Sequence, residues 1–408
     1  MASAPGMISS VVSSHPDPGL DLAHQIQQFL AVPHEALGIR IWPGMQIPEV
    51  IAALVAIIIG FAVILAFVSV TVMILVYLER KVAGHIQSRL GPMRVGWHGI
   101  LQSIADGLKL FLKEDIVPAS AHKVLFTLAP AVVLVGALVP FAALPFATGV
   151  VVANMDAALF FVLAFTALEV IGVVMAGWAP NSKWSLYGGM RLAAQMIAYE
   201  IPLGISALVI VVLSGSLNFY EIVENQRVLP YALMSPWAFL AFFLFYIAGL
   251  ASTKRAPFDL PEAESELVSG FHTEYSGLRF AFFFLAEYAA MVLVSAVASI
   301  LFLGGWNFPL DATHKPLLGV VQLLSKTAVL LFVMLWLRWT LPRVRIDQVM
   351  FACLKVLLPF SLVCLMGATV EILFDNHLLM WGVFVLLVAL SYLLARGSRA
   401  YTGKSVTT

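Results

Sequence analysis

The sequence predicts an all-α protein that crosses a membrane several times. Of its 408 residues, 61% are hydrophobic and only 11% are charged, whereas ordinary soluble domains carry about 25% charged residues. Apolar stretches of about 20 residues, the length that a transmembrane helix needs, recur along most of the chain, and the mean hydropathy is +0.96. These observations exclude a soluble globular domain.

Several segments have the length and composition of a membrane-crossing helix. In chain order, nine such segments cover residues 48–77, 124–146, 156–179, 192–214, 234–252, 278–304, 317–340, 351–374 and 379–395. We therefore expect a single transmembrane helical domain over residues 48–395, with an N-terminal extension at residues 1–47 and a tail at residues 396–408.

The N-terminal extension has no basic start followed by a short apolar core, so it is not predicted to be a cleavable signal peptide. Within it, Leu22, Ile26, Phe29 and Leu30 recur at helical spacing. This spacing predicts an amphipathic helix that lies on a membrane surface or on a partner.

Lys and Arg gather in alternate loops of this arrangement. Most of them fall in the tail and in loops 78–123, 180–191, 253–277 and 338–350. By the positive-inside rule, these loops and the tail face the cytoplasm and the N-terminus lies outside. An apolar stripe in the first loop predicts an amphipathic helix along the membrane surface; its residues are Trp97, Leu101, Ile104, Leu108 and Phe111. Gly188-Gly189 predicts a turn in the second loop.

Four carboxylates, Glu169, Glu200, Glu287 and Glu371, lie inside predicted spans. An ionised residue at the bilayer centre costs about 2.5–3.5 kcal/mol on insertion scales, so such residues commonly serve ion or proton movement. The alternative is an interhelical salt bridge or hydrogen bond. We favour proton movement for the first three. Glu371 lies near the end of its span and is expected to reach water.

Pro202 follows Glu200 closely in the same predicted span. A proline removes one backbone hydrogen bond and can open a helix locally. Open helices at membrane depth often line polar cavities, although a simple kink that aids packing is the alternative.

A second group of acids lies in the loop 253–277 and comprises Asp259, Glu262, Glu264, Glu266 and Glu274. Crowded carboxylates near a membrane repel one another and lose hydration, and both effects raise pKa. Such a cluster is suited to proton exchange near neutral pH. Asp259 and Glu262 also have capping-box spacing, so a helix start is an alternative for these two. Candidate cationic partners are Arg255, His272 and Arg279.

Signatures of catalysis by the chain alone are lacking in the sequence. It contains no P-loop, dinucleotide fingerprint, GxSxG elbow, HExxH motif or CxxC pair, and no haem or flavin attachment signal. The two cysteines, Cys353 and Cys364, lie within apolar sequence. We therefore expect no iron–sulfur cluster and no other redox centre in this chain.

Charged and glycine-containing motifs follow one another in a specific order over about residues 50–395. They are Glu79-Arg80-Lys81, Arg89-Leu90-Gly91-Pro92, Asp106-Gly107-Leu108-Lys109, Tyr199-Glu200, Arg255-Ala256-Pro257-Phe258-Asp259-Leu260-Pro261-Glu262, Glu274-Tyr275-Ser276-Gly277, Ala286-Glu287-Tyr288 and Leu341-Pro342-Arg343-Val344-Arg345. This series resembles the H-subunit family of respiratory complex I, the proton-pumping NADH:quinone oxidoreductase.

The resemblance implies a translocase component at the junction of the hydrophilic and membrane arms, with quinone as substrate and no cofactor bound by the chain itself. FMN and iron–sulfur clusters would lie in partner subunits. The implied partners are the hydrophilic arm at the cytoplasmic face, the small and antiporter-like membrane subunits, and membrane lipid; nucleic acid is not among them.

The resemblance also assigns roles to residues. Those near the quinone path would be Arg80, Arg89, Asp106 and Phe258. Those on the proton-coupling path would be Glu169, Glu200, Asp259, Glu262, Glu264, Glu266, Glu274 and Glu287.

Two departures from the family's pattern bear on the function and the location of the protein. The family often has Glu-Thr-Asn or Glu-Thr-Gly before the arginine, where this chain has Ser252-Thr253-Lys254, so an acid is replaced and a cation is added. The N-terminal extension has no counterpart in the compact mitochondrial members, which favours a bacterial plasma membrane.

Other functions remain open at this point. One is the equivalent subunit of a related membrane-bound hydrogenase-type proton pump. A stand-alone proton-coupled carrier is disfavoured by the basic cytoplasmic face and by the lack of an inverted repeat. A purely structural anchor is disfavoured by the intramembrane acids, which apolar residues would replace at little cost.

Overall fold

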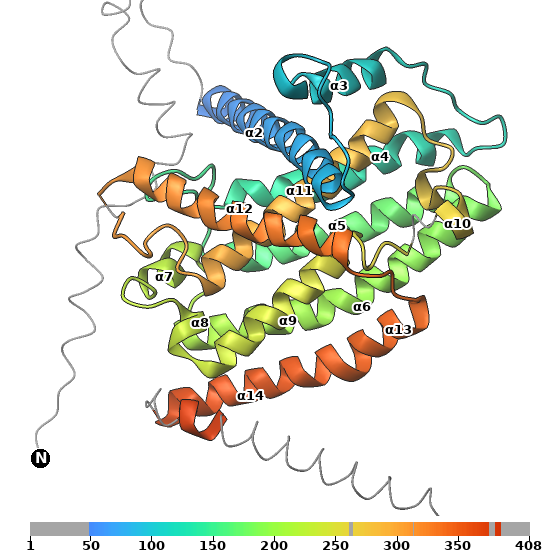
Figure 1. The fold of residues 1–408 in the computed structure, drawn as a ribbon. Helices are drawn as coiled ribbons and strands as arrows, with labels where there is room; N and C mark the ends of the chain where they lie inside the picture. Colours follow the sequence, from blue (N-terminus) through green and yellow to red (C-terminus); the bar gives the residue numbers. More distant parts are fainter. Residues whose placement is uncertain (1–48, 261–263, 313, 375–379, 385–408) are drawn as a thin grey trace, which may run out of the picture.

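The computed structural model describes residues 49–260, 264–312, 314–374 and 380–384, and these residues form helices and connecting loops without a strand (Figure 1). The longer helices are α2 (Glu49–Ile86), α3 (Gln102–Leu112), α4 (Lys123–Leu138), α5 (Ala158–Trp178), α6 (Lys183–Ser214), α9 (Pro236–Ser252), α11 (Gly277–Phe302), α12 (Pro316–Thr340) and α14 (Leu358–Phe374). The shorter ones are α7 (Phe219–Glu224), α8 (Tyr231–Met234), α10 (Glu264–Leu267) and α13 (Ile346–Phe351).

The prediction of an all-α membrane protein is confirmed. In the described part of the chain, seven helices are long and apolar enough to cross a membrane, and the last of them runs continuously through α13 and α14. The apolar helix α9 is shorter, with 17 residues. These helices match eight predicted segments. Most of the segment 379–395, and all of the predicted helix in the N-terminal extension, lie outside the described residues, so the count of nine stays a prediction.

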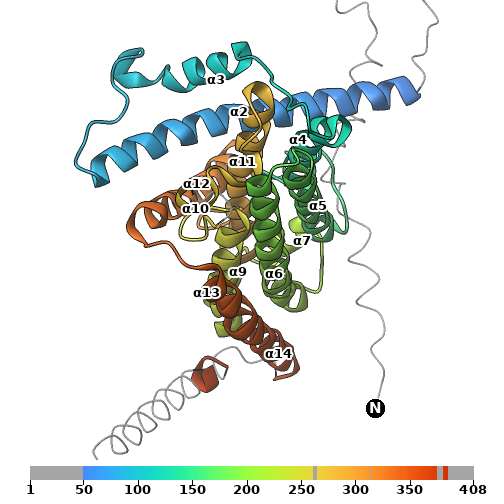
Figure 2. The same cartoon turned by 90° about the vertical axis from the view of Figure 1, so that its right-hand side faces the viewer.

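Helix α6 occupies the middle of the bundle, where it packs against α5, α9 and α14. Helix α11 packs against α4, α9 and α12. Figure 2 shows α2 lying across the direction of α5, α6 and α9, with α3 beside it. Much of α2 is exposed, as Ile57, Phe61 and Ile74 show. Its surface is therefore available to lipid or to other subunits.

Two predicted helix boundaries are wrong. Helix α2 continues past residue 77 to Ile86, so Glu79 and Arg80 belong to the helix and not to a loop. Helix α6 begins at Lys183 instead of residue 192, and the predicted turn at Gly188-Gly189 is helical. The predicted amphipathic helix of the first loop is confirmed, because α3 spans Gln102–Leu112 and exposes Leu108 and Phe111.

The two glycines of α6 are helical because their missing side chains allow neighbouring backbones to approach. A Cβ on Gly188 would lie 2.6 Å from the Gly270 Cα and from the Phe271 nitrogen, in the 3-10 turn η4 (Gly270–His272). The Ser185 hydroxyl donates to the Phe271 carbonyl (2.9 Å) at the same contact. The contact fixes η4 against α6, and η4 carries His272.

Pro202 leaves α6 continuous, and the carbonyl that it leaves unpaired in the helix is satisfied elsewhere. A proline cannot donate to the carbonyl four residues earlier, which is that of Ala198. The Cys353 thiol donates to this carbonyl (2.6 Å). Cys353 lies in a turn of π-helix, Ala352–Leu357, between α13 and α14, and π-turns often occur where a helix must adjust to a special contact. This interaction joins α6 to the last described span.

We predict that Gly188→Ala lowers the stability of the protein by about 1–3 kcal/mol, because the added methyl overpacks a backbone contact. Gly204→Ala, in the same helix, is the matched control, since a Cβ there meets nothing within 4 Å. Thermal unfolding of the detergent-purified protein measures both. A melting temperature of Gly188→Ala equal to that of the control would contradict the close contact.

Candidate functional site

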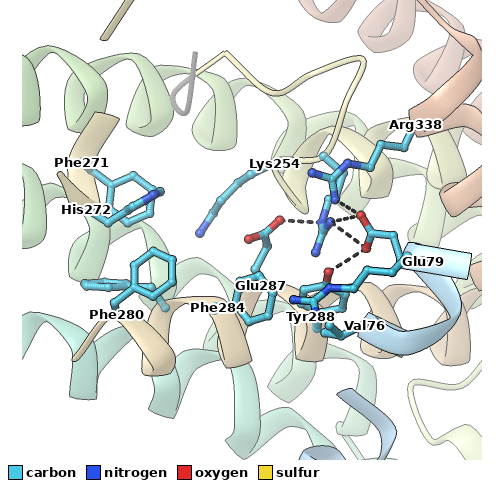
Figure 3. Close-up of a pocket in the computed structure, with 13 residues that line it drawn as sticks. Val76, Glu79, Lys254, Phe271, His272, Phe280, Phe284, Glu287, Tyr288 and Arg338 are labelled. Atoms are coloured by element: carbon cyan, nitrogen blue, oxygen red, sulfur yellow. Dashed lines mark hydrogen bonds and ion pairs between the residues drawn. The ribbon is translucent and has the colours of Figure 1, made fainter. Parts of the chain in front are cut away.

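Glu79 is the centre of a buried network of charged residues (Figure 3). Arg255 donates to both of its carboxylate oxygens (3.1 Å each), and Arg338 forms an ion pair with it. The Tyr288 hydroxyl donates to Glu79 Oε2 (2.7 Å). These groups come from four different parts of the chain, namely α2, the loop after α9, α12 and α11, so one carboxylate joins all four.

Arg255 connects this carboxylate to a second one. Its Nε lies 2.5 Å from Glu287 Oε1, its guanidinium carbon lies 4.0 Å from the centre of the Tyr288 ring, and its side chain is only 3% exposed. Burial alone would lower the pKa of Arg255, but Glu287 and Glu79 outweigh this effect and raise it. Arg255 is therefore a permanent cation between two carboxylates.

Lys254 forms a separate buried ion pair with Glu169. The Lys254 Nζ lies 2.5 Å from Glu169 Oε1, and both side chains are 4% exposed. Lys254 has a positive φ of 60°, a conformation that costs energy for a residue with a Cβ. The backbone turn and the ion pair together place a cation next to the arginine network.

A cavity of about 290 Å³ adjoins both groups. Its charged and polar lining comes from Glu79, Arg80, Lys254, Arg255, His272, Glu287, Tyr288 and Arg338. Its apolar lining is mostly aromatic, from Phe271, Phe280, Phe283 and Phe284. We call this space the arginine cavity. Polar groups that converge in an otherwise apolar cavity are typical of a functional site.

A second cavity, of about 100 Å³, holds Glu169 and Glu200. Thr166 and Ser252 add hydroxyl groups, and the remaining lining is apolar. We call it the glutamate cavity. Glu169 lines this cavity while its partner Lys254 lines the arginine cavity, so the ion pair is the direct link between the two spaces.

The ionisable groups thus form one array that runs from Glu200 through both cavities. In spatial order it comprises Glu200, Glu169, Lys254, Glu287, Arg255, Glu79 and Arg338. Opposite charges alternate over most of it. The predicted proton-coupling residues Glu169, Glu200 and Glu287 are therefore brought together by the structure.

His272 lies at the edge of the array, in η4. Burial and then the positive charge of Lys254 lower its pKa to about 4. The imidazole is therefore neutral near pH 7, and the charge of the arginine cavity comes from its carboxylates, its arginines and Lys254.

The acids of the loop 253–277 are less closely grouped than the sequence indicated. Glu266 is 58% exposed and forms an ion pair with Arg191 (2.6 Å). The expectation of a raised pKa is wrong for Glu266, because the Arg191 hydrogen bond and charge lower it. The expected cations are also engaged elsewhere: Arg255 binds Glu79 and Glu287, and Arg279 lies 3.1 Å from Asp115.

The other acids of this loop are placed only in part. Asp259 and Glu274 are half-buried, and Arg343 donates to the Asp259 backbone carbonyl. Glu264 begins the short helix α10. Glu262, and with it the predicted capping box, lies outside the described residues.

The residues predicted for the quinone path fall in three places. Arg80 forms an ion pair with Asp106 of α3 and also lines the arginine cavity. Arg89 is exposed just after α2. Phe258 packs against the ring of Tyr199 (5.6 Å between ring centres), and its carbonyl accepts a hydrogen bond from Gln195 (2.9 Å).

Glu371 does not reach water, contrary to expectation. It is buried and accepts a hydrogen bond from the Ser235 hydroxyl. It does not line either cavity. This hydrogen bond ties α14 to the start of α9, and it fits the alternative that an intramembrane acid serves as an interhelical hydrogen-bond partner.

Sequence reasoning missed Glu79, Tyr288 and Arg338 as site residues. Glu79 belongs to the triplet Glu79-Arg80-Lys81 at a predicted helix end. Charged side chains at such an end usually reach water, so Glu79 was not expected to be buried. The available signal was the presence of Glu79 and Tyr288 in motifs that follow the family order. Among the described residues, no group of three or more His, Cys, Asp or Glu could hold a metal ion.

Comparisons with known proteins give a consistent result. The family model described as NADH dehydrogenase matches residues 59–369. A protein of Chlorobium luteolum, named as the H-subunit of NADH-quinone oxidoreductase, is 49% identical over 302 residues, covering 71% of this chain and 81% of that protein. A Rhizobium meliloti protein, named as a second H-subunit of that enzyme, is 47% identical over 323 residues, covering 77% and 96%. The Rhodospirillum centenum H-subunit is 45% identical over 340 residues, covering 82% and 98%.

We predict that Glu79→Gln destabilises the protein by about 3–5 kcal/mol, the usual cost of removing one partner from a buried ion pair. The reason is that Arg255 would keep its charge with half of its compensation lost. Glu266→Gln is the matched control, since its pair with Arg191 is exposed and contributes little. Denaturation of the detergent-purified protein measures both variants. Equal midpoints for the two variants would contradict the central position of Glu79.

Proposed function

Because the chain belongs to the NADH dehydrogenase family, as an H-subunit of bacterial NADH-quinone oxidoreductase, we propose that it forms part of the quinone-reduction chamber and couples quinone reduction to proton translocation. The chain is a multi-pass membrane subunit of this translocating enzyme. Its contributions to the quinone-reduction chamber and to the proton path are what we propose.

The array of buried charges is the observation that carries the coupling proposal. In a site of low effective dielectric, adding or removing one charge changes the energy of every neighbouring charge far more than it would in water. Ion pairs and shared cavities join Glu200 to Arg338 without a break. A change of charge at one end of the array therefore alters proton affinity along its length, which is the physical requirement for long-range coupling.

Quinone reduction supplies such a change of charge. A quinone that accepts two electrons must also take up two protons to become a quinol, and its oxygens carry negative charge until they do. Arg80 and Arg338 line the arginine cavity and would stabilise that charge. The acids Glu287, Glu169 and Glu200 would then respond to it by binding or releasing protons. The electrons come from redox centres that we assign to partner subunits.

The size of the arginine cavity supports a shared chamber. Sites for drug-sized ligands have volumes of roughly 300–1,000 Å³, whereas this cavity has about 290 Å³. A cavity of this volume has room for a quinone head group but not also for its tail, so a complete quinone needs additional walls. We propose that partner subunits supply these walls at the face where Arg80, Arg89 and Asp106 lie.

The same face is the proposed docking surface for the hydrophilic arm. Helix α3 exposes Leu108 and Phe111 beside α2, and Trp97 is exposed just before it. We propose that this face is cytoplasmic and that the protein lies in the bacterial plasma membrane. The small and antiporter-like membrane subunits would contact other surfaces of the bundle.

Purification of the tagged chain in mild detergent tests the proposal as a whole. We expect NADH:quinone reductase activity that quinone-site inhibitors abolish, together with FMN and iron–sulfur clusters from partner subunits. Nickel–iron hydrogenase activity in their place would favour the hydrogenase-type pump, and a chain that purifies alone without redox centres would favour a carrier or an anchor.

We predict that Glu200→Gln and Glu287→Gln each lower proton translocation at least about tenfold, because each removes a titratable group from the array; a tenfold change corresponds to about 1.4 kcal/mol. Glu371→Gln is the control, a buried acid that lines neither cavity. The measurement is proton uptake or release per NADH oxidised by the complex in sealed vesicles. Normal turnover and proton yield in Glu200→Gln and Glu287→Gln would refute the assigned path.

We predict that Arg80→Gln raises the KM for quinone about fivefold, the upper end of what an exposed charge pair contributes. The rate of NADH oxidation with a hydrophilic artificial acceptor should not change, because that reaction does not need the quinone chamber. Arg227→Gln, which disrupts an exposed ion pair with Glu224 elsewhere, is the control. If both variants keep the normal KM, Arg80 is not part of the quinone path.

A further inference from the structure

Lys254 and Glu169 form the ion pair that links the two cavities. The Lys254 side chain lines the arginine cavity, and its ammonium is bound to Glu169, which lines the glutamate cavity. Both partners are almost fully buried. The ion pair therefore joins the two spaces, and a proton can pass between them at this pair.

The surroundings of Lys254 offer its ammonium a second anionic partner. The groups that face it are Glu169 from α5, Phe271 and His272 from η4, and Glu287 from α11. In the view of Figure 3, the Glu287 carboxylate lies between Lys254 and Glu79. Its other neighbour is Arg255, whose Nε lies 2.5 Å from Glu287 Oε1. The Phe271 ring is 5.7 Å from the ammonium and presents a face that favours a cation.

Lysine is suited to move between two such partners. It carries a compact charge on a flexible stem of four carbons, whereas arginine binds carboxylates through a rigid planar fork. Arg255 is held by two carboxylates and by the Tyr288 ring. Lys254 and Arg338 each pair with one carboxylate and line the arginine cavity, and of these two Lys254 is the one with the flexible stem and compact charge.

We propose that Lys254 is a mobile counter-ion that turns from Glu169 toward Glu287, and so makes the proton occupancy of one cavity depend on that of the other. The inference rests on the proposed proton-coupling function and adds a residue to it. A purely structural ion pair would stay on Glu169, whereas a mobile Lys254 transmits the protonation of Glu169 to Glu287 by exchanging partners.

The proposed cycle conserves every proton. A proton leaves Glu200 and binds Glu169, which becomes neutral and no longer compensates the ammonium. Lys254 keeps its three N–H bonds and turns into the arginine cavity, where its charge lowers the proton affinity of Glu287. The ammonium pairs with the Glu287 carboxylate, which it then shares with Arg255. Lys254 returns when Glu169 gives its proton to an oxygen of the reduced quinone and becomes a carboxylate again, and Glu200 regains a proton from solvent.

A double variant tests whether the proton yield depends on the Lys254–Glu169 pair without leaving an uncompensated charge buried. Lys254→Met combined with Glu169→Gln removes both charges together, so no uncompensated charge remains buried. We expect the variant complex to assemble and to oxidise NADH, with a proton yield per electron at least about fivefold lower, which is the lower end of coupling between linked sites. A normal proton yield would overturn the proposal.

Lys254→Arg provides a second test that does not depend on the double variant. The substitution keeps the charge and the pairing with Glu169, so a compensating cation would be fully replaced. We expect a lower proton yield, because the fork would remain on Glu169. A normal yield in Lys254→Arg would overturn the proposal.

Lys326→Met is the matched control, because Lys326 is a half-buried lysine that donates to the Leu303 and Gly305 carbonyls (2.7 Å each), outside the array. Its proton yield should be normal. The Glu200→Gln variant distinguishes a failure of the Lys254 inference from a failure of the proposed proton path. Reduced yield in Glu200→Gln with normal yield in Lys254→Arg would refute this inference alone, whereas normal yield in Glu200→Gln would refute the proton path itself.

Discussion

The burial of Glu79 between two arginines is the constraint on which the site depends. This carboxylate brings α2 together with α11, α12 and the loop that follows α9, through contacts with Tyr288, Arg338 and Arg255. Helix α2 buries Val68, Val72 and Leu75 in the core but leaves much of its apolar surface exposed, so the contact at Glu79 fixes the end of the helix that reaches the site. The same contact fixes Arg255, which in turn places Glu287. A single buried charge thus organises the walls of the arginine cavity.

The sequence was sufficient for the fold class and for most spans, because long apolar runs have few alternatives in water. It also singled out Glu169, Glu200 and Glu287 as candidate site residues, because an acid within an apolar span is costly to bury and is commonly functional. Helix ends were less predictable: α2 and α6 run on beyond their apolar segments. Hydropathy does not detect a polar helical turn that is stabilised by tertiary contacts.

The pairing of charges could not be predicted, because partners far apart in sequence meet only in the folded bundle. Glu266 looked like a member of an acidic cluster, but Arg191 of α6 reaches it and gives it the behaviour of an ordinary exposed acid. Lys254 looked like a departure from the family's pattern, and the structure gives it a buried partner in Glu169. The family's motifs indicate which residues gather, and geometry decides which of them interact.

The network around Glu79 also has a consequence for biosynthesis. Glu79 and Arg255 are 176 residues apart, and Glu79 and Arg338 are 259 residues apart. At a synthesis rate of about 5–20 residues per second, Glu79 leaves the ribosome roughly 10–50 seconds before its last partner exists. During this interval the nascent chain carries an unpaired acid close to the membrane. The bundle therefore closes late, when α12 arrives, and a chain released before that point would lack a cation on which its first described helix depends.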